Sequence, residues 1–330
     1  MYGRNRWLYL GLLILPAILA GCGQTAFQIK MVPTNRQLVE SRIQRDAGLF
    51  VSDKIVIIDV DGMLANRRRS GWMRSGENPV SLFIEKLDKA AADKSVKAVV
   101  LRLNSPGGTV AASDIMYHHL MKFRRQTGKP VIACVLGIGC SGAYYVACGC
   151  DGIIAQPSGV VGNIGTVFQT FSVAGTMEKI GVKAVTIKSG ELKDMASPLH
   201  DLSVEEHEVL QGIIKQFSEQ FFEVVRKGRK NIDEKKLTDG RVFTAQQALQ
   251  QGLIDKIGYL DDSIKWAREI AGVKKTSVVI YHRPSNYKPN AYGLAAASSD
   301  GIGPLVNLEL PDWLNAGGAQ FLYLWQPAVD

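Results

Sequence analysis

The chain has 330 residues, of which 46% are hydrophobic and 21% charged, and its formal net charge is +8 at pH 7. This composition is typical of a globular protein with a sizeable core, and it excludes a disordered chain and a multi-spanning membrane protein. The positive charge suits contact with an anionic membrane surface. No zinc-finger, homeodomain or RNA-binding signature accompanies it, so we expect no nucleic-acid partner.

The N-terminal segment has the pattern of a bacterial lipoprotein signal. Two arginines precede an apolar run over residues 7–21, which is too short to span a bilayer comfortably. The run ends in Leu-Ala-Gly-Cys, which resembles a lipobox, so Cys22 is the predicted lipidation site; a plain signal peptide and a signal anchor are the alternatives. We expect a signal peptide at 1–21, a membrane tether at 22–50, and a lipid-anchored protein of the cell envelope whose folded part lies outside the cytoplasm.

Helical and strand patterns alternate along the rest of the chain. Strands are predicted at 54–60, 98–103, 131–136, 152–155 and 184–188, and helices at 79–93, 110–127, from about 141, at 203–226 and at 244–251. This alternation predicts an α/β fold with a largely parallel sheet. Ligands bind at the carboxyl ends of the strands in such folds.

A segment of small residues at 136–147 carries the strongest candidate for chemistry. It places Ser141 between the strand 131–136 and a helix, as a nucleophile elbow does. A turn or helix-capping serine is the alternative. Gly107 and Gly108 follow another strand, and their backbone N–H groups could form an oxyanion hole.

The four remaining cysteines, Cys134, Cys140, Cys148 and Cys150, surround this elbow. Their spacing does not fit a zinc site, so we interpret them as small core residues. Cys140, beside Ser141, is a rival candidate as a thiol nucleophile. We expect no metal and no cofactor.

A serine nucleophile needs a base. None of the five histidines lies in a glycine-rich strand end, although a Ser-His-Asp triad stays open because triads are spatial. A desolvated lysine can replace histidine. Lys188 and Lys193 lie at the exit of a predicted strand, and both are candidates.

Four ordered motifs settle the interpretation by resemblance. They are Ser105-Pro-Gly-Gly108, Cys140-Ser-Gly-Ala-Tyr-Tyr145, Ile187-Lys-Ser-Gly-Glu-Leu-Lys-Asp194 and the run from Asp239 to Asp255. Together, over residues 52–272, the chain resembles the signal peptide peptidase A family of serine proteases.

The resemblance implies a Ser/Lys dyad. Its nucleophile and base map onto Ser141 and Lys193, because the family's interval of 52 positions separates them here. The oxyanion donors map onto Gly107 or Gly108 and onto Gly142. Asn163 stands where the family has a serine that orients the lysine, and an amide cannot relay a proton as a hydroxyl might.

The resemblance also implies a Clp/crotonase-like fold of repeated ββα units and a homo-oligomeric ring, with the base supplied across a subunit boundary. We expect the protease domain at 51–272 and a C-terminal extension at 273–330. The implied activity is that of a membrane-anchored serine endopeptidase that degrades remnant signal peptides and other membrane-proximal peptides.

Two other functions compete with this one. A catalytically impaired ring of the same fold could bind peptides as a scaffold, and Asn163 keeps that alternative open. The segment 57–64 resembles the first motif of haloacid-dehalogenase phosphatases, with Asp59 as nucleophile and Asp61 beside it, but Met63 replaces the expected threonine. A crotonase-type acyl-CoA enzyme is disfavoured, because an exported protein lacks coenzyme A.

Overall fold

The structure is a computed structural model that describes residues 37–47, 51–67, 70–71, 74–75, 77–230, 232, 237, 239–284 and 321–325. The predicted signal peptide, residues 1–21, and the predicted lipidation site, Cys22, lie outside the described residues.

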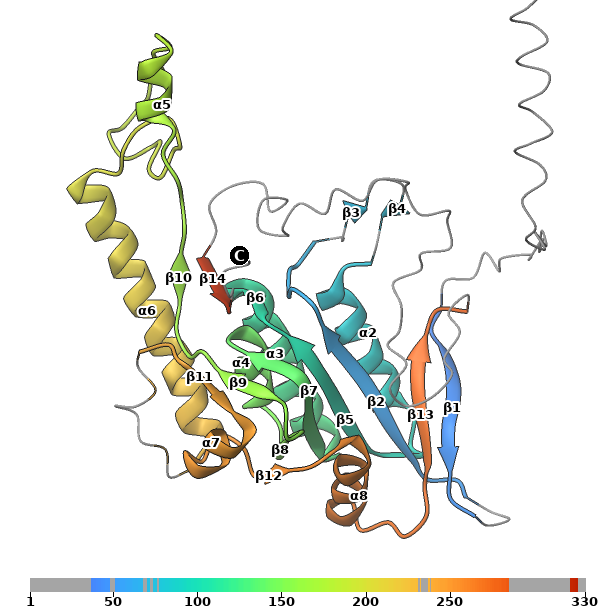
Figure 1. Cartoon of the computed structure of the whole chain (residues 1–330). Coiled ribbons are helices and arrows are strands. Elements are labelled where there is room, and N and C mark those ends of the chain that lie inside the picture. Colours follow the sequence, from blue (N-terminus) through green and yellow to red (C-terminus); the bar gives the residue numbers. More distant parts are fainter. Residues whose placement is uncertain are drawn as a thin grey trace, which may run out of the picture. The chain divides into compact units, whose positions relative to one another are not determined.

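A nine-stranded sheet forms the centre of the described fold (Figure 1). Seven of its strands lie side by side in the order β1 (Val39–Arg45), β13 (Ser277–His282), β2 (Lys54–Asp61), β5 (Val96–Ser105), β7 (Val131–Cys140), β8 (Gly152–Ala155) and β12 (Lys256–Ile257). In this row every pair from β13 to β12 is parallel, and β1 is antiparallel to β13. β9 (Val160–Gly162) pairs with the end of β7, and β11 (Val242–Thr244) pairs with β9. The predicted largely parallel α/β sheet is confirmed.

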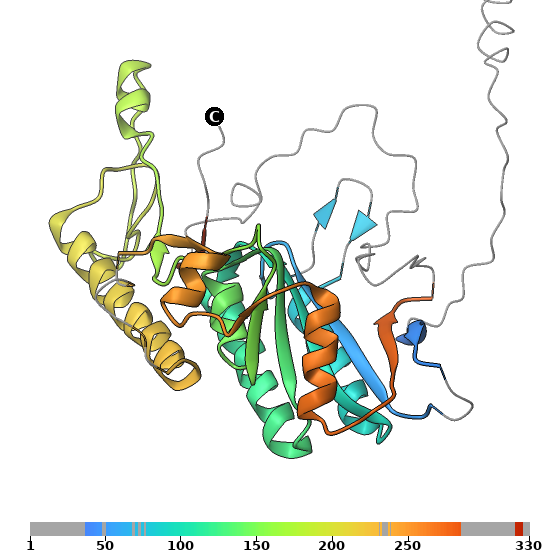
Figure 2. The same cartoon turned by 60° about the horizontal axis from the view of Figure 1, so that its bottom comes forward.

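Helices cover both faces of this sheet, because alternate residues of its buried strands point into two separate cores. α2 (Pro79–Ala92) and α3 (Val110–Thr127) pack on one face, with Val99 and Leu101 of β5. α8 (Leu260–Ile270) packs on the other face, with Ala98 and Val100. Figure 2 shows α8 on the opposite side of the strands from α2 and α3.

Local capping signals fix where several helices begin and end. The Thr109 side chain accepts the backbone N–H of Ala112 at the start of α3, and Gly128 ends the helix with φ 66°. α6 (Val204–Gly228) begins with a capping box between Ser203 and Glu206. α7 (Ala245–Gln250) begins in the same way at Thr244. The helices predicted at these places are therefore confirmed.

A second, small sheet lies beside the end of β7. It consists of β10 (Val167–Phe168), β14 (Phe321–Leu324) and β6 (Gly107–Thr109), with β14 in the middle. β6 follows β5 and leads into α3, so these three elements form one ββα unit of the kind that the Clp/crotonase-like fold repeats. β3 (Ser70–Gly71) and β4 (Arg74–Ser75) form a separate short hairpin.

An exposed arm, residues 169–203, joins β10 to α6 and includes α5 (Ala174–Lys179) (Figure 1). None of its residues is buried. The strand predicted at 184–188 is wrong: these residues form no regular structure, and Ile187 is 97% exposed. Their alternating apolar pattern finds no neighbouring strand among the described residues with which to pair.

The sheet extends past both predicted limits of the protease domain. β1 lies before residue 51, in the predicted tether, and β13 lies after residue 272, in the predicted extension. These two strands pair with each other, and β13 pairs with β2. The division of the chain into domains stays a prediction.

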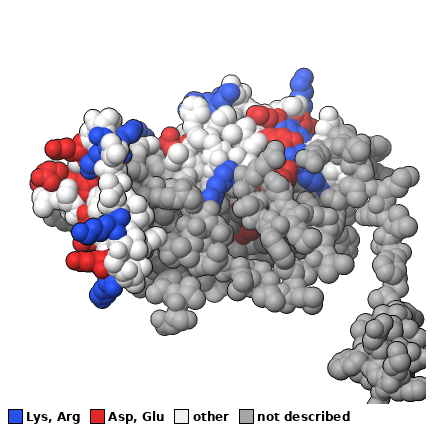
Figure 3. Space-filling model, turned by 90° about the horizontal axis from the view of Figure 1, so that it is seen from above, with Lys and Arg blue, Asp and Glu red and all other residues white. Residues whose placement is uncertain are grey.

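The positive charge and the apolar N-terminal run predict contact with a membrane. Among the described helices, none has the length and apolar character that crossing a bilayer requires. On the face shown in Figure 3, described acidic and basic side chains intermix along the side where α5 and α6 lie.

Candidate active site

Ser141 lies at the carboxyl end of β7, where the chain turns sharply into α4 (Gly142–Ala147). Its backbone has φ 51° and ψ −118°, a conformation that a serine rarely adopts. The turn is held because the Ser141 N–H donates to the Gly162 carbonyl at 2.7 Å, and the Ser141 carbonyl accepts the Tyr145 N–H at 2.9 Å. Ser141 therefore sits in a strained elbow between a buried strand and a buried helix.

The hydroxyl of Ser141 is buried and uncommitted. The residue is 1% exposed, and its Oγ has no hydrogen-bond partner among the described residues. It does not cap α4 with its side chain. This observation disfavours the alternative of a capping serine, because a capping hydroxyl would accept a backbone N–H of the helix.

The glycine segment after β5 lies directly against this elbow, because Ser105 pairs with Gly139 of β7. The Ser105 hydroxyl accepts the Gly107 N–H at 3.1 Å and donates to the Gly62 carbonyl at 2.6 Å. Gly107 is thus an unsuitable oxyanion donor, since its N–H is already used. The geometry favours Gly108 over Gly107.

Gly108 and Gly142 approach each other so closely that neither could carry a side chain. A methyl group on Gly142 would lie 3.2 Å from the Gly108 nitrogen and 2.2 Å from the Ser113 hydroxyl oxygen. One on Gly108 would lie 1.9 Å from the Leu64 carbonyl oxygen. Two backbone N–H groups therefore converge next to Ser141, and the one on Gly142 belongs to the unsatisfied first turn of a helix.

A residue that sequence reasoning missed completes this region. The Tyr323 carbonyl oxygen, on β14, lies 2.1 Å from where a methyl on Gly107 would be and 3.1 Å from where one on Gly142 would be. The sequence analysis predicts only that this segment belongs to a C-terminal extension, residues 273–330. The run of alternating aromatic and aliphatic residues at 321–325 was the available signal.

The predicted lysine base is not part of this group. Lys193 lies exposed on the arm, and within the described residues its ammonium has no hydrogen bond or ion pair. Figure 1 shows that the chain runs from β9 through β10 into this arm, away from α4. In one copy of the chain, the fold brings Ser141, Gly108 and Gly142 together and leaves Lys193 outside.

Lys188, the other candidate, is committed to neighbours. Its ammonium donates to Asp194 Oδ1 at 2.7 Å and to the Glu191 carbonyl at 2.7 Å. The hydrogen bond from Lys188 lowers the pKa of Asp194. Both contacts hold the Lys188 ammonium within the arm, so the geometry favours Lys193 over Lys188.

Asn163 lies close to Ser141 through the backbone. It follows β9, whose Gly162 carbonyl accepts the Ser141 N–H. The Asn163 side chain donates through Nδ2 to the Gly240 carbonyl at 2.6 Å. Its Oδ1 is thus the atom that could face an incoming ammonium.

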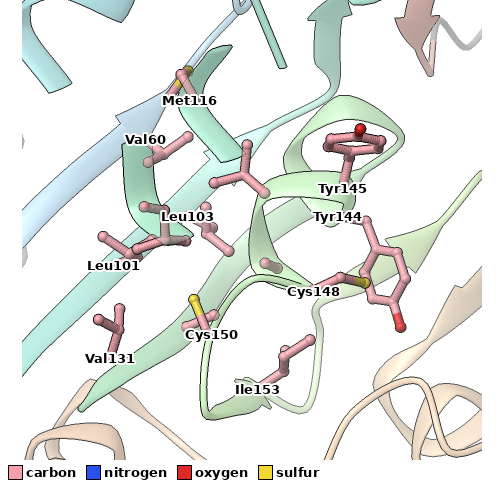
Figure 4. Close-up of a cluster of buried hydrophobic side chains, with 14 of the residues drawn as sticks. Val60, Leu101, Leu103, Met116, Val131, Tyr144, Tyr145, Cys148, Cys150 and Ile153 are labelled. Atoms are coloured by element: carbon pink, nitrogen blue, oxygen red, sulfur yellow. The ribbon is translucent and has the colours of Figure 1, made fainter. Parts of the chain in front are cut away.

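The cysteines around the elbow are buried and free, as the sequence predicts for core residues. Figure 4 shows Cys148 and Cys150 packed in the core with Tyr144 and Tyr145. Burial raises the pKa of the Cys140 thiol to about 12. Since the thiolate is the nucleophile, Cys140 is a poor rival to Ser141.

Asp59 and Asp61 belong to the sheet rather than to a phosphatase site. Asp59 forms an ion pair with the buried Arg102, and the Lys86 ammonium lies 3.9 Å from it. The Asp61 carboxylate accepts a hydrogen bond from Asn104 at 3.3 Å. A nucleophilic carboxylate would have to be accessible, whereas Asp59 neutralises a buried guanidinium.

One cluster could in principle hold a metal. Single ligand atoms of Asp194, His200 and Glu206 lie within 4.8 Å of one another. The Asp194 carboxylate already pairs with Lys188, and Glu206 caps α6 through the Ser203 N–H. The cluster thus ties the arm to α6.

Another histidine, His282, forms a hydrogen bond with the Ser41 hydroxyl between β13 and β1, at the far edge of the sheet.

Comparison with known proteins assigns the family. Residues 123–274 match the model of peptidase family S49. A relative from Enterococcus faecium, named "Putative signal peptide peptidase SppA", is 31% identical over 280 residues, covering 81% of this chain and 80% of the relative. "Serine protease SPPA, chloroplastic" of Arabidopsis thaliana is 31% identical over 258 residues, covering 76% of this chain and 38% of the relative. "Protease 4" of Haemophilus influenzae is 32% identical over 233 residues, covering 69% and 37%. The chain therefore belongs to peptidase family S49 and is a serine peptidase.

Proposed function

We propose that this peptidase works with a Ser/Lys dyad whose serine and lysine come from two copies of the chain. The single observation that carries the proposal is the contrast at the site: Ser141 is buried, strained and uncommitted beside two N–H groups, and Lys193 is exposed without a partner among the described residues. Within the described residues of one copy, Ser141 thus has oxyanion donors beside it but no base.

The arm supplies a reason to expect a second copy. Large apolar side chains are exposed along it and at the start of α6, and they are Phe171, Ile180, Val182, Val185, Ile187, Leu192, Leu199, Leu202 and Val204. An exposed apolar surface of this kind is typical of a contact with another protein. A head-to-tail contact that repeats around an axis closes a ring, which would bring Lys193 of one copy to Ser141 of the next.

The chemistry of the assembled site then follows from its groups. Lys193 Nζ takes the Ser141 hydroxyl proton, and the oxygen attacks the peptide carbonyl carbon. The N–H groups of Gly108 and Gly142 stabilise the oxyanion. The amine leaves with the proton from Lys193, and water then hydrolyses the acyl-serine ester. Asn163 Oδ1 would orient the lysine.

The proposed substrates are remnant signal peptides and other membrane-proximal peptides, which the enzyme meets as a lipoprotein anchored through Cys22. The likeness to signal peptide peptidases supports the substrate class. The lipobox-like segment supports the anchor. Two or more acyl chains on Cys22 would give stable attachment to the membrane.

Complementation tests the dyad and its division between copies. Ser141→Ala and Lys193→Met should each abolish labelling by a fluorophosphonate probe and cleavage of a fluorogenic peptide. Co-expressed in equal amounts, the two variants should regain about a quarter of wild-type activity, because about one site in four pairs an intact serine with an intact lysine. A mixture as inactive as its parts would contradict a shared site.

The pH dependence separates this enzyme from the scaffold alternative. Labelling of the wild type should rise with pH, because only a neutral amine can accept the serine proton. A ring that only binds peptides would bind them without reacting with the probe at any pH.

A further inference from the structure

The arm holds the turn around Lys193 without any buried residue. Residues 191–196 form consecutive turns. The Lys193 N–H donates to the Gly190 carbonyl at 3.1 Å, and the Ser197 N–H donates to the Asp194 carbonyl at 2.9 Å. Segments with few buried contacts open easily. The polar side chains around these turns therefore decide how firmly the backbone of Lys193 is held.

His200 connects this turn to the chain that leads into α6. Its Nε2 lies 3.2 Å from the Asp194 carbonyl oxygen, and its Nδ1 lies 2.9 Å from the Asp201 carbonyl oxygen. A carbonyl oxygen only accepts, so each bond needs an N–H on the ring, and the protonated imidazole has both. Hydrogen bonding to the Asp201 carbonyl raises the pKa of His200 accordingly. The Asp194 carbonyl, directly after Lys193, thus faces two donors, Ser197 and His200.

Two carboxylates lie beside the same ring. Asp194 Oδ2 is 3.6 Å from His200 Nε2, and Glu206 Oε1 is 3.8 Å from it. Their other oxygens accept the Lys188 ammonium at 2.7 Å and the Ser203 N–H at 2.9 Å. The Asp194 side chain is only 16% exposed and that of Glu206 only 4%. Solvent therefore screens these contacts less than it would screen ion pairs elsewhere on the arm.

Glu206 anchors the cluster to a firmly packed element. It lies in the first turn of α6, whose Phe221 and Val225 belong to the main core. Figure 1 shows the arm running directly into this helix. A continuous series of contacts thus leads from α6 through Glu206 and His200 to Asp194, the residue next to Lys193.

We propose that His200 is a positioning residue for Lys193: it fastens the turn that carries the base to the first turn of α6, so that the lysine approaches Ser141 of the neighbouring copy in one preformed geometry. His200 fixes the shape of the turn, whereas the contact with the neighbouring copy fixes its place. In this role His200 contacts neither the substrate nor the reacting atoms. The inference rests on the proposed function of Lys193.

Removing the ring should slow the reaction without weakening substrate binding. In the full-length protein, His200→Ala should lower kcat for a fluorogenic peptide about tenfold and leave KM within about twofold, because fewer sites hold the lysine in its productive position. His200→Gln keeps an N–H donor for the Asp194 carbonyl, and its kcat should stay within about threefold of the wild type. His207→Ala removes an exposed histidine of α6 and is the matched control, with unchanged kcat. Equal kcat values for His200→Ala and the wild type would overturn the inference.

Hydrogen exchange measures the turn independently of catalysis. In full-length Ser141→Ala protein, adding His200→Ala should make the amides of residues 193–197 exchange at least about fivefold faster, while those of residues 221–225 stay unchanged. Equal exchange at 193–197 would overturn the inference. Dissociation of the His200→Ala protein into single copies, where the wild type stays assembled, would also overturn it, because the cluster would then act in assembly. Full activity of Lys193→Met would instead contradict the proposed function, whatever the exchange rates show.

Discussion

The Ser141 elbow and the Lys193 arm are opposites in structure, although the proposed reaction needs both. The elbow is buried, lies between sheet and helix, and tolerates no side chain on its glycines. The arm has no buried residue and exposes its apolar side chains. A rigid nucleophile can be positioned within one chain, whereas a base on such an arm gains a fixed position only from what packs against it. The following predictions test this difference.

The largest effect is expected at the base. Lys193→Met should lower kcat by about a thousandfold or more. The exposed side chain contributes no burial, so the unfolding temperature should change little. Lys188→Met removes the same charge from the same arm and should cost less than about tenfold. Peptide cleavage and thermal unfolding of both variants check this; equal losses in the two would remove the distinction between the lysines.

A smaller effect, on both activity and stability, is expected from a substitution in the elbow. Gly142→Ala places a methyl 2.2 Å from the Ser113 hydroxyl oxygen, so it should lower activity about a hundredfold and destabilise the fold by about 1–3 kcal/mol. Gly212→Ala in α6 is the matched control. Its methyl would meet nothing within 4 Å, and it should stabilise the helix by about 0.5–1 kcal/mol. Denaturant unfolding and peptide cleavage measure both effects.

A substitution at Asp93, at the opposite end of the sheet, should change stability without changing catalysis. Partial burial would raise the pKa of Asp93, but hydrogen bonds from Ser95 and Lys54 outweigh it and lower the pKa from 3.8 to about 2. The ionised carboxylate thus stabilises the fold above pH 4, and this contribution is lost as the pH falls towards 2. Asp93→Asn should cost about 1 kcal/mol at pH 7, with solvent screening included, and clearly less at pH 2, where about half of the native carboxyl groups are protonated. Unfolding at the two pH values checks the sign.

The smallest effect is expected from the thiol beside the nucleophile. Burial raises the pKa of Cys140 to about 12 and that of Cys148 to about 12, so both stay neutral at pH 8. Neither should react with a disulfide reagent in the native protein, and Cys140→Ala should change activity less than about threefold. Mass mapping of modified cysteines measures their reaction with the disulfide reagent. A fast reaction at Cys140 would mean that the elbow opens.

Local signals in the sequence were sufficient for much of the fold. The helix over 110–127 matches its predicted limits because Thr109 and Gly128 cap it. The strand before Ser141 was predicted because residues 131–136 form a short apolar run that includes β-branched residues. Both features depend on neighbours within a few positions.

Features that depend on distant partners were missed. The strand expected at 184–188 has the right residues but no strand beside it in the described part of the chain. β14 could not be predicted from its own residues, because its pairing with β6 joins positions more than two hundred apart. In the candidate site, the glycine donors followed from the motif at the strand end and from the family resemblance, but the choice of Gly108 over Gly107 required the Ser105 hydrogen bond.

Serine is an unfavourable choice for the backbone at position 141. The conformation with φ 51° and ψ −118° is less costly for glycine than for serine, by about 1 kcal/mol or more. Ser141→Gly should therefore relieve the backbone strain while removing the hydroxyl that the proposed reaction needs. The reactivity proposed for Ser141 is therefore maintained at a cost in conformational stability.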